Sequence, residues 1–221
     1  MRFCLCPFVE GDFPLSADPA ASVWQKSVWS EDFQDIQGPQ LPKPLHRTRF
    51  KTAWNKDGIA FLAELQEPHV WATLTEHDSV IFYDNDFELF LDPDGDSHNY
   101  MEFEINAFGT TWDLLLPRPY RAGGPALDGY EVKGMKSKVR VEGTINDPSD
   151  IDVGWWVEIF IPWAGLEDYA GVGLPPKAGD QWRINFSRVQ WQVDIVDGKY
   201  VKRKGKPEDN WVWSPQGVID M

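Results

Sequence analysis

Two stretches of the chain alternate regularly between apolar and polar residues, which is typical of strands with two different faces. The stretches are 86–92 and 100–107, and each has one fully apolar face. The opposite faces carry mostly carboxyl, amide and phenol groups, at Asp86, Glu88, Phe90 and Asp92 in the first and at Tyr100, Glu102, Glu104 and Asn106 in the second. The sequence therefore predicts two half-buried strands with acidic, solvent-facing sides, around which we expect the rest of the chain to be organised.

Two further pairs of alternating segments predict hairpins. Asp57-Gly58 and Asp197-Gly198 lie between them, and Asp-Gly favours the left-handed backbone that a tight hairpin turn needs. The hairpin strands are expected at 47–54 with 59–65, and at 193–196 with 199–202.

The remaining pattern indicates an all-β protein. A segment rich in proline and glycine, 117–129, predicts a long surface loop, and 163–169 predicts one short helix. Further strands are expected at 111–116, 135–143, 155–162 and 181–191. Short strands at this spacing, with almost no helix, predict an antiparallel β-sandwich, jelly-roll-like, formed by residues 1–221 as a single domain.

The composition narrows the range of partners. The 221 residues carry a formal net charge of -14, which would repel the phosphates of nucleic acids and anionic membranes, so we expect neither as a partner. No run of 18 apolar residues and no signal peptide is found in the given chain. Cys4 and Cys6, one residue apart, would point to opposite sides of an extended strand, so no mutual disulfide is expected.

Catalytic signatures such as a phosphate-binding glycine loop or a nucleophile elbow are absent from the sequence. One acidic pair deserves comparison with glycoside hydrolases, which need two carboxyl groups roughly 5 to 10 Å apart. Glu102 and Glu104 on one strand face would lie about 7 Å apart. Because solvent-facing carboxylates more often serve solvation or ligand binding, we interpret them as binding groups and not as a catalytic pair.

The connection after the first alternating strand, 92–96, is dense in aspartate and turn-forming residues. Asp92, Asp94 and Asp96 offer the hard oxygen ligands that Ca²⁺ prefers, although the order of residues departs from an EF-hand loop. The alternatives are a structural calcium site and a simple acidic turn. If the loop binds calcium, Ca²⁺ will raise the melting temperature and a chelator will lower it.

Four segments together resemble a known family. They read DFELFLD at 86–92, YMEFEIN at 100–106, GWWVEIFIPW at 154–163 and WRINFSR at 182–188. In this order they resemble the family 9 carbohydrate-binding modules, most closely the family-9-like branch of bacterial polysaccharide-degrading systems, across roughly residues 24–215. The resemblance implies a β-sandwich that binds β-linked sugars of the cellulose or xylan class. It also implies an extracellular or periplasmic location, membership of a larger glycoside-hydrolase polypeptide or system, and structural calcium in some members.

The resemblance also implies a sugar held between two aromatic rings. The first ring is expected just before residue 86, where this chain has Phe82 and Tyr83, and we favour Tyr83 because its hydroxyl can stay hydrated. The second is expected near the terminal W-S-P element, which makes Trp213, or else Trp211, the candidate. Glu102, Glu104 and Asn106 are expected to bind sugar hydroxyls. The chain stops close to where the family's last strand is expected, so that strand could be missing.

Three other classes of function remain open. Related sandwiches include b-type haem domains for electron transfer, for which His98 and Met101 are the nearby ligand types, although residues three apart cannot reach opposite sides of one haem. A hydrolase or lyase using Glu102 and Glu104 is the second, and a purely structural domain is the third.

Overall fold

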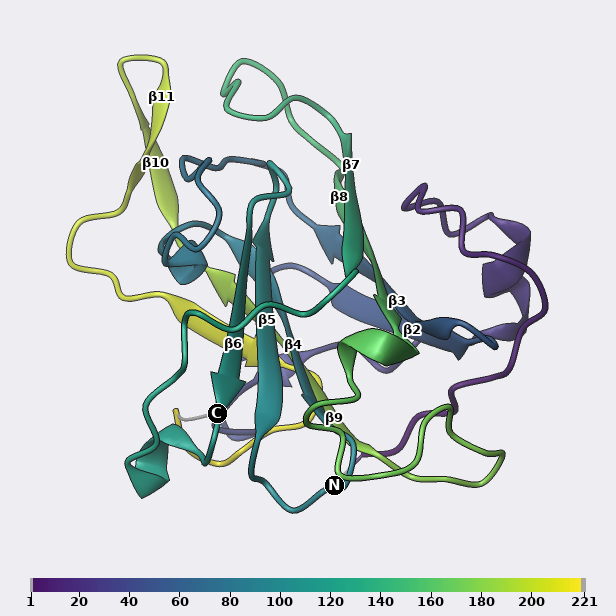
Figure 1. Cartoon of the computed structure of the whole chain (residues 1–221). Helices are drawn as coiled ribbons and strands as arrows, with labels where there is room; N and C mark the ends of the chain where they lie inside the picture. Colours follow the sequence, from purple (N-terminus) through teal and green to yellow (C-terminus); the bar gives the residue numbers. More distant parts are fainter. Residues whose placement is uncertain (1, 220–221) are drawn as a thin grey trace.

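The computed structural model describes residues 2–219 and shows two antiparallel sheets packed face to face (Figure 1). The larger sheet has the strand order β1-β12-β9-β4-β5-β6, with β1 at Gln34–Asp35, β12 at Asp209–Val212, β9 at Arg183–Gln190, β4 at Asp86–Asp92, β5 at Tyr100–Asn106 and β6 at Thr111–Leu116. The smaller sheet has the order β2-β3-β8-β7, with β2 at Thr48–Trp54, β3 at Gly58–Gln66, β8 at Gly154–Pro162 and β7 at Lys136–Glu142. The predicted all-β sandwich is confirmed.

The core lies between the sheets and is built from the apolar faces of the alternating strands. Phe87 and Leu89 of β4 and Phe103 of β5 meet Phe61 of β3 and Trp155 of β8 in one cluster. All five side chains are at most 2% exposed. The period-2 pattern therefore assigns the core face of each sheet correctly.

Both predicted hairpins form, but only one uses a left-handed turn. Asp197 and Gly198, between β10 (Val193–Val196) and β11 (Lys199–Lys202), have φ values of 50° and 72°. This hairpin projects from the body at the upper left of Figure 1. Neither Asp57 nor Gly58 has a positive φ, and there the Asn55 side chain closes the turn by accepting hydrogen bonds from the Asp57 and Gly58 amides. Gly58 is needed for a different reason, since a Cβ atom would lie 2.3 Å from the carbonyl oxygen of Ile161.

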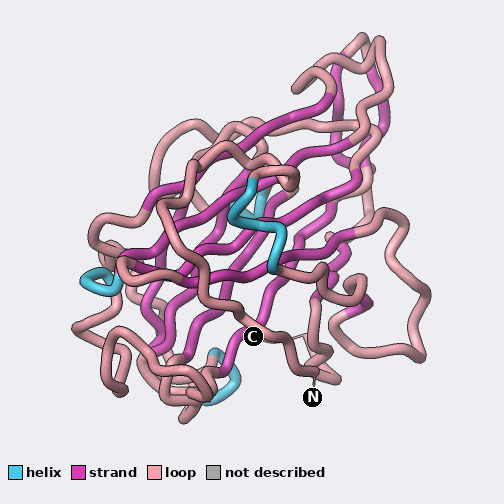
Figure 2. The backbone as a smooth tube through the Cα atoms, turned by 90° about the vertical axis from the view of Figure 1, so that its right-hand side faces the viewer, coloured by secondary structure: helices cyan, strands magenta, loops and turns pink. Residues whose placement is uncertain are grey.

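Helical structure in the described residues is limited to short 3-10 turns, visible as brief cyan segments in Figure 2. These turns are η1 at Ser22–Lys26, η2 at Ile81–Tyr83, η3 at Tyr120–Ala122 and η4 at Trp163–Gly165. The helix predicted for 163–169 is therefore a single turn. Gly165 is a poor helix former and sits so close to Lys133 that a Cβ would lie 2.7 Å from its carbonyl oxygen. Over residues 2–219, no helix is long and apolar enough to cross a bilayer.

The acidic faces of β4 and β5 are not solvent-facing, contrary to the prediction. Asp86, Glu88, Glu102 and Glu104 are all at most 6% exposed. Neighbouring rings and loops cover this side of the sheet, where Phe90 packs in a second apolar cluster. Alternation separates the two faces of a strand, but it carries no information about whether a distant loop later covers the polar face.

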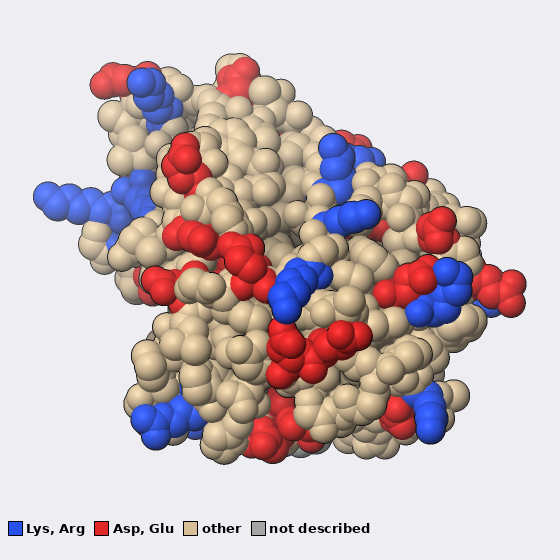
Figure 3. Space-filling view, in the orientation of Figure 1, with Lys and Arg blue, Asp and Glu red and all other residues tan. Residues whose placement is uncertain are grey.

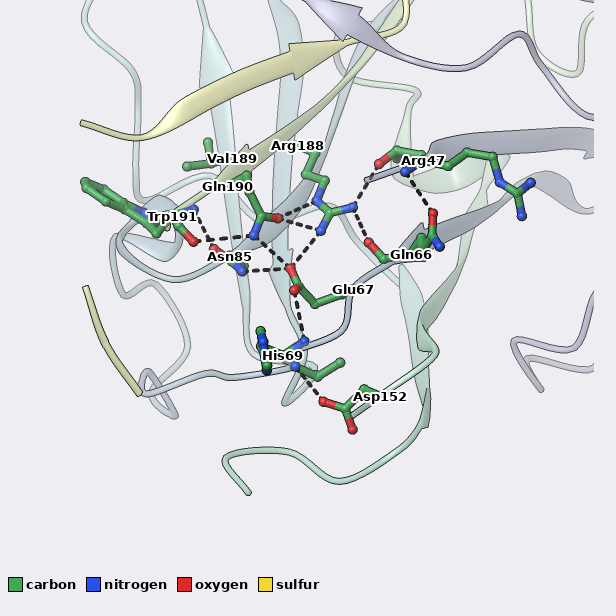
Figure 4. A network of polar contacts seen from close by, with 12 residues as sticks. Arg47, Gln66, Glu67, His69, Asn85, Asp152, Arg188, Val189, Gln190 and Trp191 are labelled. Atoms are coloured by element: carbon green, nitrogen blue, oxygen red, sulfur yellow. Dashed lines mark hydrogen bonds and ion pairs between the residues drawn. The ribbon is translucent and has the colours of Figure 1, made fainter. Parts of the chain in front are cut away.

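A buried arginine fastens the two sheets together at one end. Arg188 of β9 is 0% exposed and donates hydrogen bonds to Thr48 Oγ1 at 3.1 Å and to the Gln66 carbonyl at 3.0 Å, both from the smaller sheet. Its Nη2 lies 2.9 Å from Glu67 Oε2, and its Nε donates to Gln190 Oε1 at 2.8 Å (Figure 4). Every polar group on the guanidinium is thus matched inside the protein.

Candidate functional site

A cavity of about 310 Å³ opens on the outer face of the larger sheet, on the side away from the core. This volume is at the lower end of the usual range for small-molecule sites. Neighbouring strands contribute to it across most of the sheet, together with η2, η3 and the C-terminal segment. The lining residues are Phe82, Glu88, Phe90, Glu102, Glu104, Trp112, Tyr120, Ser187, Val189, Glu208, Asn210 and Ile219.

The floor of the cavity is made of carboxyl groups from two adjacent strands. Glu88 and Glu104 face each other directly in the antiparallel register of β4 and β5, and Glu102 lies two pairs further along, opposite Phe90. Tyr120 donates its hydroxyl hydrogen to Glu102 Oε2 at 2.8 Å. The backbone amide of Phe82 donates to Glu104 Oε2 at 2.9 Å. Each hydrogen bond fixes the orientation of one carboxyl group through its Oε2 atom.

Burial changes the protonation of these groups. Desolvation raises the pKa of Glu88 to about 7, against the hydrogen bond from Ser187, which lowers it. Desolvation and then the neighbouring charge of Glu88 raise the pKa of Glu102 to about 8. The pKa values of Asp86 and Glu104 are also raised well above their usual range, first by desolvation. The cluster therefore keeps protons at neutral pH, and its members can donate as well as accept hydrogen bonds.

This cluster predicts that the protein loses stability as the pH rises. A carboxyl group with a raised pKa binds its proton more tightly in the folded state, so its stabilising contribution is complete below the unfolded pKa and is lost as the pH passes the folded pKa. For Glu88 and Glu102, that window runs from about 4.5 to about 8. We expect the melting temperature to fall across it. In a Glu88→Gln/Glu102→Gln variant the fall should be smaller, and parallel profiles for the two proteins would contradict the assignment.

Aromatic rings form the side of the cavity. The rings of Phe82 and Trp112 lie 6.5 Å apart between centroids and are inclined by 31°. Phe90 adds a third ring to the lining. The indole Nε1 of Trp112 is buried and makes no hydrogen bond within the protein. Flat apolar surfaces next to hydrogen-bonding groups are the combination that suits a pyranose ring.

No basic residue lines the cavity, whereas four glutamates do. This local excess of acidic residues agrees with the formal net charge of -14. On the surface that faces the viewer in Figure 3, Asp and Glu side chains gather across the middle. A strongly anionic ligand would find no cationic partner among the described lining residues. Neutral or cationic groups match the cavity better.

Comparison with known proteins identifies the fold. No protein-family model matches the chain, and no curated protein is similar to it in sequence. Among solved structures, a proposed carbohydrate-binding protein from Bacteroides uniformis has a TM-score of 0.58 at 19% identity, covering 87% of this chain and 79% of its own. A family 9 carbohydrate-binding module from Caldicellulosiruptor kristjanssonii, in complex with cellotriose, has a TM-score of 0.54 at 14% identity, covering 93% and 81%. A family 9 carbohydrate-binding module from the same organism, in complex with glucose, has a TM-score of 0.56 at 14% identity, covering 92% and 83%.

This chain has the family 9 carbohydrate-binding module fold. Within that fold, the structure puts Phe82 in the cavity and leaves Tyr83 beside it, where Tyr83 is 55% exposed and lies under Lys202. Residues 81–83 form the 3-10 turn η2, and within it the ring of Phe82 lines the cavity, whereas Tyr83, which we favoured for its hydroxyl, does not.

The second expected ring wall does not form as anticipated. Trp211 and Trp213 are each 3% exposed and belong to the inter-sheet core of this family 9 fold. Trp213 packs at 5.2 Å from Phe50 and 6.3 Å from Phe186, between ring centroids. Neither tryptophan is among the described residues that line the cavity, whereas Trp112 is.

Asn106 is also an unsuitable ligand group. Its amide nitrogen donates to the Leu74 carbonyl and to Asp84 Oδ2, and its oxygen accepts from the Phe108 and Thr110 amides. The side chain is 0% exposed. Its polar atoms are fully used in holding the loops beside β5, so its role in this family 9 fold is structural.

The acidic turn brings its three aspartates together. Oxygen atoms of Asp92, Asp94 and Asp96 lie within 4.8 Å of one another, with Asp92 buried and the other two exposed. Asp92 also accepts hydrogen bonds from the Gly95 and Ser97 amides, which is what a plain acidic turn would use it for. Calcium binding here therefore stays a prediction.

The haem alternative gains nothing from the structure. Met101 is 3% exposed and packs inside the core between the sheets, whereas His98 is exposed in the turn after β4. The two side chains do not share a cavity.

Several lining residues were not predicted as site residues from the sequence. Glu88 and Phe90 lie on the polar face of the first alternating strand. The alternation alone could therefore have identified them as candidate site residues. Trp112 follows the same alternation in β6. Tyr120 comes from η3 after β6, Glu208 directly precedes β12 and Asn210 belongs to it. Only the tertiary structure brings these three residues to the site.

Proposed function

We propose that this protein is a non-catalytic carbohydrate-binding domain, and that a β-linked sugar of the cellulose or xylan class binds in the cavity on the outer face of the larger sheet. The observation that carries the proposal is the coincidence, in one cavity, of two aromatic rings with an array of buried carboxyl groups. The solved structures with cellotriose and with glucose share the fold, which supports a saccharide as the ligand.

The cavity offers complementary contacts to such a sugar. Trp112 or Phe82 can stack against the apolar face of a pyranose ring, since aromatic rings match flat C–H surfaces. Glu88 and Glu102, with their raised pKa values, can each donate or accept a hydrogen bond with a hydroxyl group. The absence of basic lining residues argues against acidic sugars as the preferred ligand.

The same carboxyl groups do not form a convincing catalytic pair. Glycoside hydrolases separate the two roles by environment, so that one carboxyl group is protonated and the other stays ionised. Here desolvation raises the pKa of all four carboxyl groups, Asp86, Glu88, Glu102 and Glu104. For none of these four groups does a neighbouring cation outweigh the desolvation, which supports a binding role over a hydrolytic one.

We further propose that the domain works outside the cytoplasm, in the periplasm or at the cell exterior, as part of a glycoside-hydrolase polypeptide or system. The support is the likeness of its fold to carbohydrate-binding proteins, together with the sequence resemblance to the family 9 modules.

Removing either ring should weaken sugar binding without unfolding the protein. We expect Trp112→Ala and Phe82→Ala each to reduce the binding free energy for cello- or xylo-oligosaccharides by about 1 to 3 kcal/mol, the scale for losing an anchoring aromatic. Isothermal titration calorimetry and affinity gels would measure this. Tyr83→Ala is the matched control, because Tyr83 is exposed and does not line the cavity. Equal losses for all three variants, or none, would place the sugar elsewhere.

The non-catalytic assignment is tested with the same ligands. The protein should release no reducing sugar from polysaccharides that it binds. Turnover that disappears in Glu102→Gln or Glu104→Gln would show that the carboxyl groups are catalytic after all.

A further inference from the structure

A histidine and three carboxylates meet along the outer edge of β6, outside the sugar cavity. His77 Nε2 lies 2.8 Å from Glu131 Oε1, 3.4 Å from Asp78 Oδ1 and 4.0 Å from Asp113 Oδ1. The four ligand atoms all lie within 4.8 Å of one another. The proposed sugar site uses none of these residues.

The other side of the imidazole is arranged as in metal-binding histidines. His77 Nδ1 lies 3.0 Å from the carbonyl oxygen of Thr111 and 2.9 Å from Thr111 Oγ1, and a protonated Nδ1 can donate to either oxygen. A histidine that ligates a metal through one nitrogen usually donates its other N–H to a carbonyl or carboxylate, which fixes the ring orientation. Here that contact turns Nε2 towards the three carboxylates.

An unsatisfied buried oxygen points into the same group. Asp113 is 1% exposed, and its Oδ2 accepts a hydrogen bond from the Val132 amide at 2.8 Å. Its Oδ1 is buried and accepts no hydrogen bond. Leaving a buried carboxylate oxygen without a partner is costly, so the position suits a cation. This observation is independent of the clustering of charges.

Backbone hydrogen bonds hold the segments that carry the four side chains against the outer edge of β6. The Asp78 amide donates to the Thr111 carbonyl at 3.0 Å, which anchors the loop carrying His77. Leu127 pairs with Leu115 along the same edge, which brings the segment carrying Glu131 alongside β6. The ligand atoms therefore come from three chain segments that are already in place.

We propose that His77, Asp78, Asp113 and Glu131 form a binding site for a divalent transition metal, with Zn²⁺ as the ion of best fit. Zinc binds imidazole nitrogen and carboxylate oxygen at about 2.0 to 2.2 Å, so tetrahedral ligands stand about 3.4 Å apart. The distances from Nε2 to the three oxygens bracket this value. In the metal-free protein, a proton between Nε2 and Glu131 fills the position that the ion would take. The bound ion would link the loop before η2, strand β6 and the segment before β7.

The experiment must first exclude the two cysteines as alternative zinc ligands. Cys4 and Cys6 are free thiols, as the sequence predicted, and zinc has high affinity for thiolates. The parent protein for the experiment is therefore the full chain with Cys4→Ser and Cys6→Ser. Titration with Co²⁺, followed by visible absorption, reports the coordination geometry, and competition with Zn²⁺ gives the zinc dissociation constant.

We expect one Co²⁺ per chain with tetrahedral d–d absorption. His77→Gln and Glu131→Gln should each raise the zinc dissociation constant at least about tenfold. Both residues are exposed, so the variants should fold, which circular dichroism would check. His98→Gln is the matched control, because His98 is also exposed, with Nδ1 3.7 Å from Asp96 Oδ1, and it should bind like the parent.

Two results would overturn the proposal. One is the absence of stoichiometric Co²⁺ binding by the folded parent, which would leave His77 and Glu131 as an ion pair only. The other is Zn²⁺ and Co²⁺ binding in His77→Gln with the same dissociation constants as in the parent. That result would place the ion at carboxylates without the imidazole.

Discussion

Replacing Arg188 with methionine is expected to lower the free energy of unfolding by about 3 to 5 kcal/mol. Arg188 and Glu67 are both buried, and their side chains are 0% and 3% exposed. Removing the guanidinium would leave the Glu67 carboxylate without its charged partner, and would remove the contacts to Thr48 and Gln66 that join the two sheets. Urea denaturation at pH 7 measures the change.

Two controls separate the buried pair from a general effect of losing an arginine. Arg203→Met breaks an exposed ion pair with Asp194, and such pairs contribute about 0 to 1 kcal/mol. The double variant Arg188→Met/Glu67→Met removes both charges and should recover part of the loss, because no unpaired ion then remains. If Arg188→Met costs no more than Arg203→Met, the network in Figure 4 does not fasten the sheets.

Trp213→Ala should destabilise the fold by about 3 to 5 kcal/mol, the usual cost of deleting a large ring from a core. Trp213 is 3% exposed and packs edge-on against Phe50 and Phe186, which come from opposite sheets. The cavity left behind would lie in the centre of the sandwich. Thermal and urea unfolding would show the loss.

The folded fraction of this variant should still bind sugar with the affinity of the parent, because Trp213 does not line the cavity. Trp112→Ala should show the opposite behaviour, with weaker binding and nearly unchanged stability. If Trp213→Ala lost affinity while keeping its melting temperature, Trp213 would be a sugar-binding wall, as the resemblance suggested.

The fold could be predicted because short stretches of sequence, such as alternating strands and turn dipeptides, specify its main elements. Residues 86–92 and 100–107 alternate so regularly that the predicted bounds match β4 residue for residue and exceed β5 by one residue at its end. The Asp197-Gly198 turn carries its own backbone preference. Each of these features depends on neighbours along the chain, which is the information that a single sequence provides directly.

The site was predicted less well because its shape depends on contacts between distant residues. Alternation placed Glu102 and Glu104 on one face, but their burial results from covering segments such as the loop that carries Tyr120. Phe82 and Trp112 become neighbours only when η2 packs across the end of β6. The resemblance pointed to Trp213 as a ring wall, and only the packing of the sheets shows that Trp213 belongs to the core while Trp112 lines the cavity.

The position of β12 constrains how the protein can be made. Residues 209–212 insert between β1 and β9, although β1 is formed by residues 34 and 35. While the chain is being synthesised, β9 therefore has one unpaired backbone edge and β1 has no partner until residues 209–212 have left the ribosome. An open edge of this kind can pair with another nascent chain. Productive folding of the larger sheet is thus a late event, and expression conditions that slow aggregation of incomplete chains should raise the yield of folded protein.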